Sequence, residues 1–282
     1  MKLNNNNRFP PDIHMHTHYC GHASGEIEAM VLQAIELGMQ TMGFSEHFYY
    51  PDFFVEPCPD CVIPQHDFPQ YLSDIGQLQS RYQGQIEILI GAEIDFLPDF
   101  ITAQQKNISK WPLDYVIGSI HMLDNLMIDF SEEDMRAHMQ VWGGVHAMWD
   151  KYWDSIGQLI DMNVCDILGH LDLPRKFSPG IVNPSHYLDR VVELLDRMLD
   201  RGLALDVNTG GIVRSAQKEM YPGKEILKYA AQKKVNISMG SDAHRAEEIG
   251  RYFPQTIAYL KSLGWDRVVY FRKRVPFYFS LI

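Results

Sequence analysis

The stretch of sequence that decides the fold is LDRVVELLDRMLDRGLALDVNTGG, which spans residues 188–211. Its first part repeats apolar side chains every three or four residues, which predicts a helix with one buried face. Pro184 precedes the helix and Gly202 ends it, and the apolar run 203–207 then has the character of a buried strand. The apolar face comprises Leu188, Val191, Val192, Leu195, Met198 and Leu199. The stretch therefore predicts an α-helix followed by a β-strand of an α/β protein.

The same alternation of strand and helix continues on both sides of this stretch. Seven or eight such units in 282 residues favour a single domain, and about 250 residues is typical of a closed (β/α) barrel. An open, doubly wound parallel sheet is the alternative fold. We expect one domain over residues 1–282, with residues 1–10 as a short N-terminal extension. The predicted strands are residues 12–14, 41–44, 86–90, 115–118, 165–168, 203–207, 235–239 and 268–271, and residues 132–160 form a long helical stretch.

The composition limits the partners that the protein can have. Asp and Glu total 36 against 25 Lys and Arg, a formal charge of −11, and an acidic chain repels the phosphates of nucleic acids. The one dense basic cluster, residues 267–274, belongs to the last predicted strand, so we expect no nucleic-acid partner. No apolar run approaches the 18 or so residues that cross a membrane, and no apolar leader is visible. These features predict a cytoplasmic protein without a membrane partner, and they leave the oligomeric state open.

The chain has four cysteines, too few for a disulfide scaffold. Cys58 and Cys61 form a lone CxxC in a Pro-rich segment, and neither Cys20 nor Cys165 supplies the second pair that a zinc knuckle needs. The sequence favours an incidental pair in a loop over a structural or redox role.

Most predicted strands are followed directly by a His, Glu or Asp. In a barrel these positions share the C-terminal mouth, where catalytic groups lie. Nitrogen and carboxylate ligands suit Zn, Mn or Fe, and nine of them are too many for one ion but fit two or three divalent ions. The nine candidate metal ligands are His14, His16, His22, His47, Glu93, His121, His170, Asp242 and His244.

Spacing strengthens the case for the first pair of these ligands. Alternation along a strand points His14 and His16 to the same side, so both can bind one ion. Glu93 can bridge two ions through its separate oxygens. An isolated histidine is more often a core or surface residue, and this interpretation applies to His18, His66, His138, His146 and His186.

In order along the chain, these motifs resemble those of the PHP (polymerase and histidinol phosphatase) superfamily. The resemblance covers residues 12–244 and rests on Asp-x-His14-x-His16-Thr, Gly-Phe-Ser-Glu-His47, Gly-Ala-Glu93, Gly-Ser-Ile-His121 and Ser-Asp242-Ala-His244. Tyr-Cys-Gly-His22-Ala and the segment 166–177 are similar to the histidinol-phosphatase branch in particular.

The resemblance implies a distorted (β/α)7 barrel with a trinuclear metal centre. It implies that such an enzyme hydrolyses L-histidinol phosphate to L-histidinol and phosphate, the penultimate stage of histidine biosynthesis. The implied ligands are His14, His16, Glu93 and Asp242 for the first ion, Glu93, His121 and His170 for the second, and His22, His47 and His244 for the third.

Phosphomonoester hydrolysis is very slow without catalysis, so we expect a hydroxide that bridges two ions to attack phosphorus. Arg175 and Arg214 are the candidate phosphate-binding residues, because a guanidinium can bond two oxygens at once. Asp242, His244 or a metal-bound water would protonate the leaving alkoxide. The residues nominated for the substrate's ammonium and imidazole are Glu46, Asp99 and Tyr49.

Two other functions remain open from the sequence. The same centre could hydrolyse another small phosphomonoester or a nucleotide. A domain of this kind could also be a non-catalytic, metal-stabilised module, but such a module would be expected to lose ligands, and all nine positions are filled here.

Overall fold

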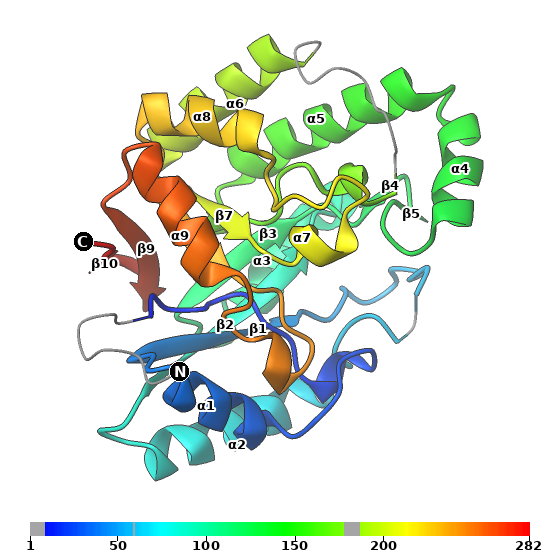
Figure 1. Ribbon diagram of the computed structural model, residues 1–282. Helices are drawn as coiled ribbons and strands as arrows, with labels where there is room; N and C mark the ends of the chain where they lie inside the picture. Colours follow the sequence, from blue (N-terminus) through cyan, green and yellow to red (C-terminus); the bar gives the residue numbers. More distant parts are fainter. Residues whose placement is uncertain (1–8, 59, 178–186) are drawn as a thin grey trace.

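A computed structural model describes residues 9–58, 60–177 and 187–282 of the chain (Figure 1). Within these residues, six parallel strands form one curled sheet in the order β1-β2-β3-β6-β7-β8. The strands are β1 (Thr41–His47), β2 (Glu87–Asp95), β3 (Tyr115–Ser119), β6 (Ile167–Leu168), β7 (Ala204–Asn208) and β8 (Ile237–Gly240). The parallel sheet predicted from the alternating pattern is confirmed.

The N-terminal segment lies between the two edges of this sheet. Isolated parallel bridges pair Phe9 with Met39, Asp12 with Met42 and Met15 with Ala243, next to β1 on one side and β8 on the other. The Ile13 amide also donates to the Met239 carbonyl over 3.2 Å. The predicted distorted (β/α)7 barrel is thus confirmed, with this segment in place of a regular seventh strand.

Helices surround the sheet, with α5 (Val145–Met162), α6 (Leu188–Arg201) and α8 (Lys224–Lys233) together on one side and α1 (Ile27–Glu36) and α2 (Phe68–Arg81) on another (Figure 1). The predicted helical stretch 132–160 is two helices, because Gly143 and Gly144 adopt positive φ angles of 89° and 109° between them. In α6, Leu194 is buried and Leu199 is 37% exposed, so the buried face is rotated slightly from the predicted one. Pro184 lies outside the described residues. The helices are α1 (Ile27–Glu36), α2 (Phe68–Arg81), α3 (Ile101–Ile108), α4 (Glu132–Val141), α5 (Val145–Met162), α6 (Leu188–Arg201), α7 (Gly211–Arg214), α8 (Lys224–Lys233) and α9 (Phe253–Ser262), with short 3-10 turns η1 (His18–Cys20), η2 (Pro98–Phe100), η3 (Leu173–Lys176) and η5 (Ala246–Glu248).

A C-terminal hairpin closes one end of the barrel. The run 268–271 is a strand as predicted, but it belongs to β9 (Arg267–Arg272), which pairs antiparallel with β10 (Val275–Ser280) outside the parallel sheet. Its apolar side chains pack with Leu89 and Tyr115, which lie near the N-terminal ends of β2 and β3. Gly91 makes room for the Tyr115 ring, since a Cβ there would lie 2.4 Å from it. The opposite end carries the short hairpin of β4 (Met122–Leu123) and β5 (Leu126–Met127).

No helix among the described residues is both long enough and apolar enough to cross a membrane.

One buried carboxylate ties the N-terminal segment to the segment that follows β8. Asp12 is fully buried, and its two oxygens each accept a backbone N–H, from Ser241 and from Gly250, both over 2.9 Å. Asp12→Asn would turn one acceptor into a donor that faces a donor. Leaving a buried group unsatisfied costs about 2 kcal/mol, so we expect the free energy of unfolding to fall by that amount in urea. The exposed Asp99→Asn should change it by less than about 0.5 kcal/mol, and equal values for both variants would contradict this account.

Candidate metal centre

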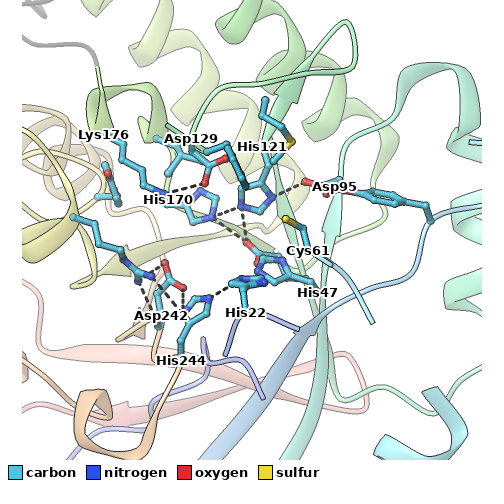
Figure 2. Close-up of a pocket in the computed structure, with 17 residues that line it drawn as sticks. His22, His47, Cys61, Asp95, His121, Asp129, His170, Lys176, Asp242 and His244 are labelled. Carbon is cyan, nitrogen blue, oxygen red and sulfur yellow. Dashed lines mark hydrogen bonds and ion pairs between the residues drawn. The ribbon is translucent and has the colours of Figure 1, made fainter. Parts of the chain in front are cut away.

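The nine predicted ligands gather at the C-terminal mouth of the barrel. Seven of them line one cavity of about 290 Å³, and Figure 2 shows their side chains converging there. His14 and His16 lie beneath it, fully buried at the end of the N-terminal segment. The ligands that line the cavity are His22, His47, Glu93, His121, His170, Asp242 and His244.

Glu93, near the end of β2, lies at the centre of the group and is 1% exposed. Its Oε1 is 3.0 Å from His170 Nε2 and 3.4 Å from His14 Nε2. Its Oε2 is 3.0 Å from His47 Nδ1 and 3.5 Å from His16 Nε2. Each carboxylate oxygen therefore faces different imidazoles, as a bridge between two ions requires.

Two groups of ligand atoms lie on either side of Glu93. In one, His14, His16 and Asp242 offer atoms within 4.8 Å of one another, with His16 Nε2 3.4 Å from Asp242 Oδ1. In the other, His121 Nε2 lies 3.2 Å from His170 Nε2. The structure thus brings together the residues expected for the first and second ions.

The third group lies nearer the surface. His22 Nε2 is 3.0 Å from His244 Nε2, and the His22 and His47 rings are 5.2 Å apart between centroids. His47 and His244 also form a candidate group with His16. His22 follows η1 and His244 follows β8, so two distant loops build this group.

Two carboxylates fix the orientation of the buried imidazoles from behind. His14 Nδ1 is 2.8 Å from Asp206 Oδ2, and His121 Nδ1 is 2.5 Å from Asp95 Oδ1. Each contact leaves Nε2 turned toward Glu93, an arrangement that is common behind metal-binding histidines. Sequence reasoning missed both acids, although a lone Asp206 within an apolar strand was a visible signal.

The charges at the centre are strongly coupled. Burial alone would raise the pKa of Glu93, but His14, His121 and His47 hold it well below its usual range. Burial would lower the pKa of His14 and His121, yet Glu93 and nearby aspartates raise it, for His121 to about 10. Burial and His16 lower the pKa of His47 to about 4. Without an ion, the cluster therefore holds protons where a cation would fit, and metal binding must release them.

Several of these buried atoms lack a hydrogen-bond partner among the described residues. They include His14 Nε2 and His16 Nε2, and also Glu93 Oε2, whose 3.0 Å contact with His47 Nδ1 does not have hydrogen-bond geometry. Buried polar atoms in folded proteins are nearly always paired, so three orphaned atoms aimed at one another indicate a missing partner. Imidazole and carboxylate donors suit a divalent transition metal such as Zn, Mn or Fe. The residues therefore fit a divalent metal centre.

Asp242 and Arg214 form an ion pair in the lining of the cavity. Asp242 has a φ angle of 54°, a left-handed conformation that is costly for a residue other than glycine and is found at functional sites. Its Oδ2 accepts from Arg214 Nη2 over 2.8 Å. Burial would raise the pKa of Asp242, but Arg214 and His16 hold it well below its usual range.

The two arginines predicted to bind phosphate lie in different places in the structure. Arg214 lines the cavity, whereas Arg175 does not and instead pairs with Asp172 and Glu219, each over 2.9 Å. The neighbouring Lys176 lines the cavity in its place.

The three residues nominated for the substrate's cationic groups do not line the cavity. Glu46 is fully buried and accepts hydrogen bonds from the backbone of Thr17 and His47. Tyr49 is buried and accepts from Trp111 Nε1, and Asp99 is exposed on η2.

The cavity instead contains polar residues that sequence reasoning missed. Asp129 Oδ2 lies 3.3 Å from Lys176 Nζ, while its Oδ1 is buried and has no hydrogen-bond partner among the described residues. Tyr50 donates to Asp95 Oδ2 over 2.7 Å. Asp129 follows the β4–β5 hairpin and Lys176 ends η3, so neither follows a sheet strand directly.

Of the histidines interpreted as non-ligands, the four that the structure describes do not line the cavity. His18 and His66 are exposed, and His138 Nδ1 donates to the Met127 carbonyl over 2.8 Å. His146 lies near the hydroxyl of Tyr187, and His186 falls outside the described residues.

Comparison with known proteins agrees with this geometry. The family model described as PHP domain matches residues 12–210. A probable histidinol-phosphatase of Deinococcus radiodurans is 30% identical over 270 residues, covering 93% of this chain and 96% of the relative. The histidinol-phosphatase of Bacillus subtilis is 29% identical over 255 residues, covering 85% and 95%.

A solved structure shares the fold. It is the histidinol phosphate phosphatase of Lactococcus lactis complexed with Zn, L-histidinol and phosphate, with a TM-score of 0.78 and 20% identity over 96% of this chain and 100% of that one. The family match extends over most of the chain and includes seven of the nine ligand positions. The chain therefore belongs to the PHP domain family, in the branch that contains the histidinol-phosphatases.

Proposed function

We propose that the protein is a metal-dependent histidinol-phosphatase that hydrolyses L-histidinol phosphate to L-histidinol and phosphate. One observation carries this proposal. The cluster of nine candidate ligands opens into a cavity that is also lined by the cationic side chains of Arg214 and Lys176 and by the carboxylate of Asp129. The names of the relatives support the same substrate. Two or three divalent ions, with Zn, Mn or Fe as candidates, would occupy the cluster.

Each proposed metal ion would be held by one of the three groups of side chains described above. His14, His16, Glu93 and Asp242 would hold one ion, Glu93 with His121 and His170 a second, and His22, His47 and His244 a third. When bound, such ions provide a water nucleophile at neutral pH and neutralise charge on the phosphoryl oxygens.

Cationic side chains would bind the remaining phosphoryl oxygens. Arg214 and Lys176 line the cavity, and each now pairs with a carboxylate that a phosphate could replace. The role predicted for Arg175 stays a prediction, because it would have to leave Asp172 and Glu219.

The far end of the substrate carries an ammonium and an imidazole. The unpaired Oδ1 of Asp129 is an acceptor that an ammonium would satisfy, since a buried carboxylate oxygen without a partner is costly. Phe130 is 63% exposed at the rim of the same cavity and offers an apolar surface for the imidazole.

Asp242 is the proposed proton carrier. Arg214 and His16 hold the pKa of Asp242 well below its usual range, so the carboxylate is charged at neutral pH and would accept the proton of the attacking water only as a weak base. Once protonated it is a strong acid, able to pass that proton to the far more basic leaving alkoxide. His244, whose pKa burial and His16 lower well below its usual range, stays neutral beside it.

The test compares histidinol phosphate, p-nitrophenyl phosphate and a dinucleotide as substrates of the wild type and of Asp129→Asn. We expect kcat/KM for histidinol phosphate to exceed the others in the wild type and to fall about 10- to 100-fold in the variant, the loss of one charge-assisted hydrogen bond. Hydrolysis of p-nitrophenyl phosphate, which has no ammonium, should change far less, and a change in it would report on Lys176, which pairs with Asp129.

The matched control is Asp124→Asn, in the turn of the β4–β5 hairpin, where the exposed side chain pairs with Lys151. It should leave all three rates unchanged. Preference for the dinucleotide, or an equal loss of both monoester activities in Asp129→Asn, would contradict the proposed substrate.

A further inference from the structure

The CxxC pair, treated above as an incidental feature of a loop, lies at the metal centre. Cys58 and Cys61 are joined by a disulfide with their Cα atoms 5.4 Å apart. Cys61 lines the cavity, and Figure 2 shows it next to His47 and close to His22. The pair belongs to the segment that connects β1 to α2.

This segment contacts the backbone that carries the third ligand group. The carbonyl of Asp60, between the two cysteines, lies 3.4 Å from His22 Nδ1, which also bonds the Cys20 carbonyl over 3.1 Å. The Asp60 carbonyl also lies close to the backbone of Gly21, where an added Cβ would be only 2.8 Å from the Asp60 oxygen. On the other side, the Ile63 amide donates to the His47 carbonyl over 2.9 Å.

The short ring limits what the disulfide can do. A disulfide stabilises a fold more as the loop that it closes grows longer, and this one joins residues only three apart. Its main effect is therefore to restrict Asp60 and Cys61 rather than to stabilise the barrel. Cys20 and Cys165, the other two cysteines, are buried and free.

We propose that the Cys58–Cys61 disulfide is a reversible positioning device for the metal ligand His22. With the disulfide formed, the Asp60 carbonyl stays against Nδ1, and Nε2 faces His244 Nε2 at 3.0 Å. Reduction frees Asp60 and weakens metal binding at the third group, while the groups around Glu93 keep their contacts. The inference rests on the proposed function only in that it assigns His22 to a metal ion.

The redox step is a two-electron exchange. A dithiol reductant breaks the S–S bond, two thiols form on Cys58 and Cys61, and the reductant becomes a disulfide. A disulfide oxidant reverses the reaction. Ligand-orienting contacts are worth about 10- to 100-fold in metal affinity, which sets the size of the expected effect.

The experiment measures zinc binding by the full-length protein in both redox states. A phosphine reductant avoids thiols that chelate zinc; with water it yields a phosphine oxide and the two protein thiols. Zinc per chain is determined after equilibration with competing chelator, and the thiols are counted by mass spectrometry after alkylation. We expect one ion to bind about tenfold more weakly after reduction, the others to be unchanged, and reoxidation to restore it.

Variants separate this effect from a general loss of stability. Cys58→Ser and Cys61→Ser should each bind the third ion as weakly as the reduced protein and should not respond to the reductant. Cys165→Ala should behave as the wild type. Equal affinity in both redox states, or tighter binding after reduction, would overturn the proposal. If zinc binding changes as expected but histidinol phosphate is not hydrolysed, the proposed function fails and this inference stands.

Discussion

Glu93→Gln is expected to keep the fold and to lose about 10³-fold or more in phosphatase kcat/KM. Removing one group that stabilises the reacting charge commonly costs 10²- to 10³-fold, and Glu93 faces two ligand groups at once. Its two oxygens lie 3.0 Å from His170 and His47. An amide has one oxygen, and its NH₂ group is no ligand, so the variant could not hold two ions in the way proposed for Glu93.

The measurement combines kinetics, metal content by mass spectrometry and circular dichroism. We expect less metal per chain and an unchanged spectrum. Glu87→Gln is the control, because Glu87 lies at the other end of the same strand and pairs with Arg272. Wild-type rates and metal content in Glu93→Gln would refute the bridging role.

Removing the metal with a chelator is expected to abolish hydrolysis and to lower the melting temperature by about 5–10 °C. A ligand present at 100 times its Kd stabilises a fold by about 2.7 kcal/mol, and each kcal/mol is worth about 2–4 °C for a large domain. His14 Nε2 and Glu93 Oε2 have no hydrogen-bond partner among the described residues, so chelation would remove the metal ion as their only partner there.

The difference in melting temperature should grow as the pH rises from about 7 to 9. In the metal-free protein the pKa of His121 is raised to about 10. The stability that this raised pKa contributes is complete below the unfolded value near 6.5 and is lost as the pH rises toward 10. Metal binding releases protons and therefore strengthens over the same range. A chelated protein with full activity, or a difference that shrinks with pH, would contradict the assignment.

Adding back single metals completes this test. Zn, Mn and Fe should each restore activity and the higher melting temperature, because imidazole nitrogens dominate the cluster. Mg, which prefers oxygen ligands, should restore little. Recovery with Mg alone would point to a different centre.

The position of the ligands could be predicted because strand ends in a barrel share one mouth. His47, Glu93 and Asp242 each follow or end a short apolar run, so locating the strands located them as well. Sequence gives no such signal for Asp129 and Lys176, which reach the cavity from a hairpin and a 3-10 turn. Their placement depends on tertiary packing.

Contacts between residues that are far apart in the sequence could not be predicted either. Arg175 was chosen for its chemistry, but Glu219, 44 residues away, occupies its guanidinium. The last strand read correctly as β-structure, yet its antiparallel partner could not be inferred from its own apolar run. A local sequence pattern predicts whether a segment is a helix or a strand more reliably than it predicts which elements pack beside that segment.

The closure of the barrel by its N-terminal segment affects when the centre can form during synthesis. The Asp242 amide donates to the His14 carbonyl over 2.7 Å, and Met15 bridges Ala243, so the beginning of the chain and its last quarter form one wall. A nascent chain carries its first two histidines from the outset but lacks the carboxylate that completes their group until about residue 242 has emerged from the ribosome. We therefore expect the group of His14, His16 and Asp242 to bind metal only after residue 242 has been synthesised, and a polypeptide that ends before it lacks two of the nine proposed ligands.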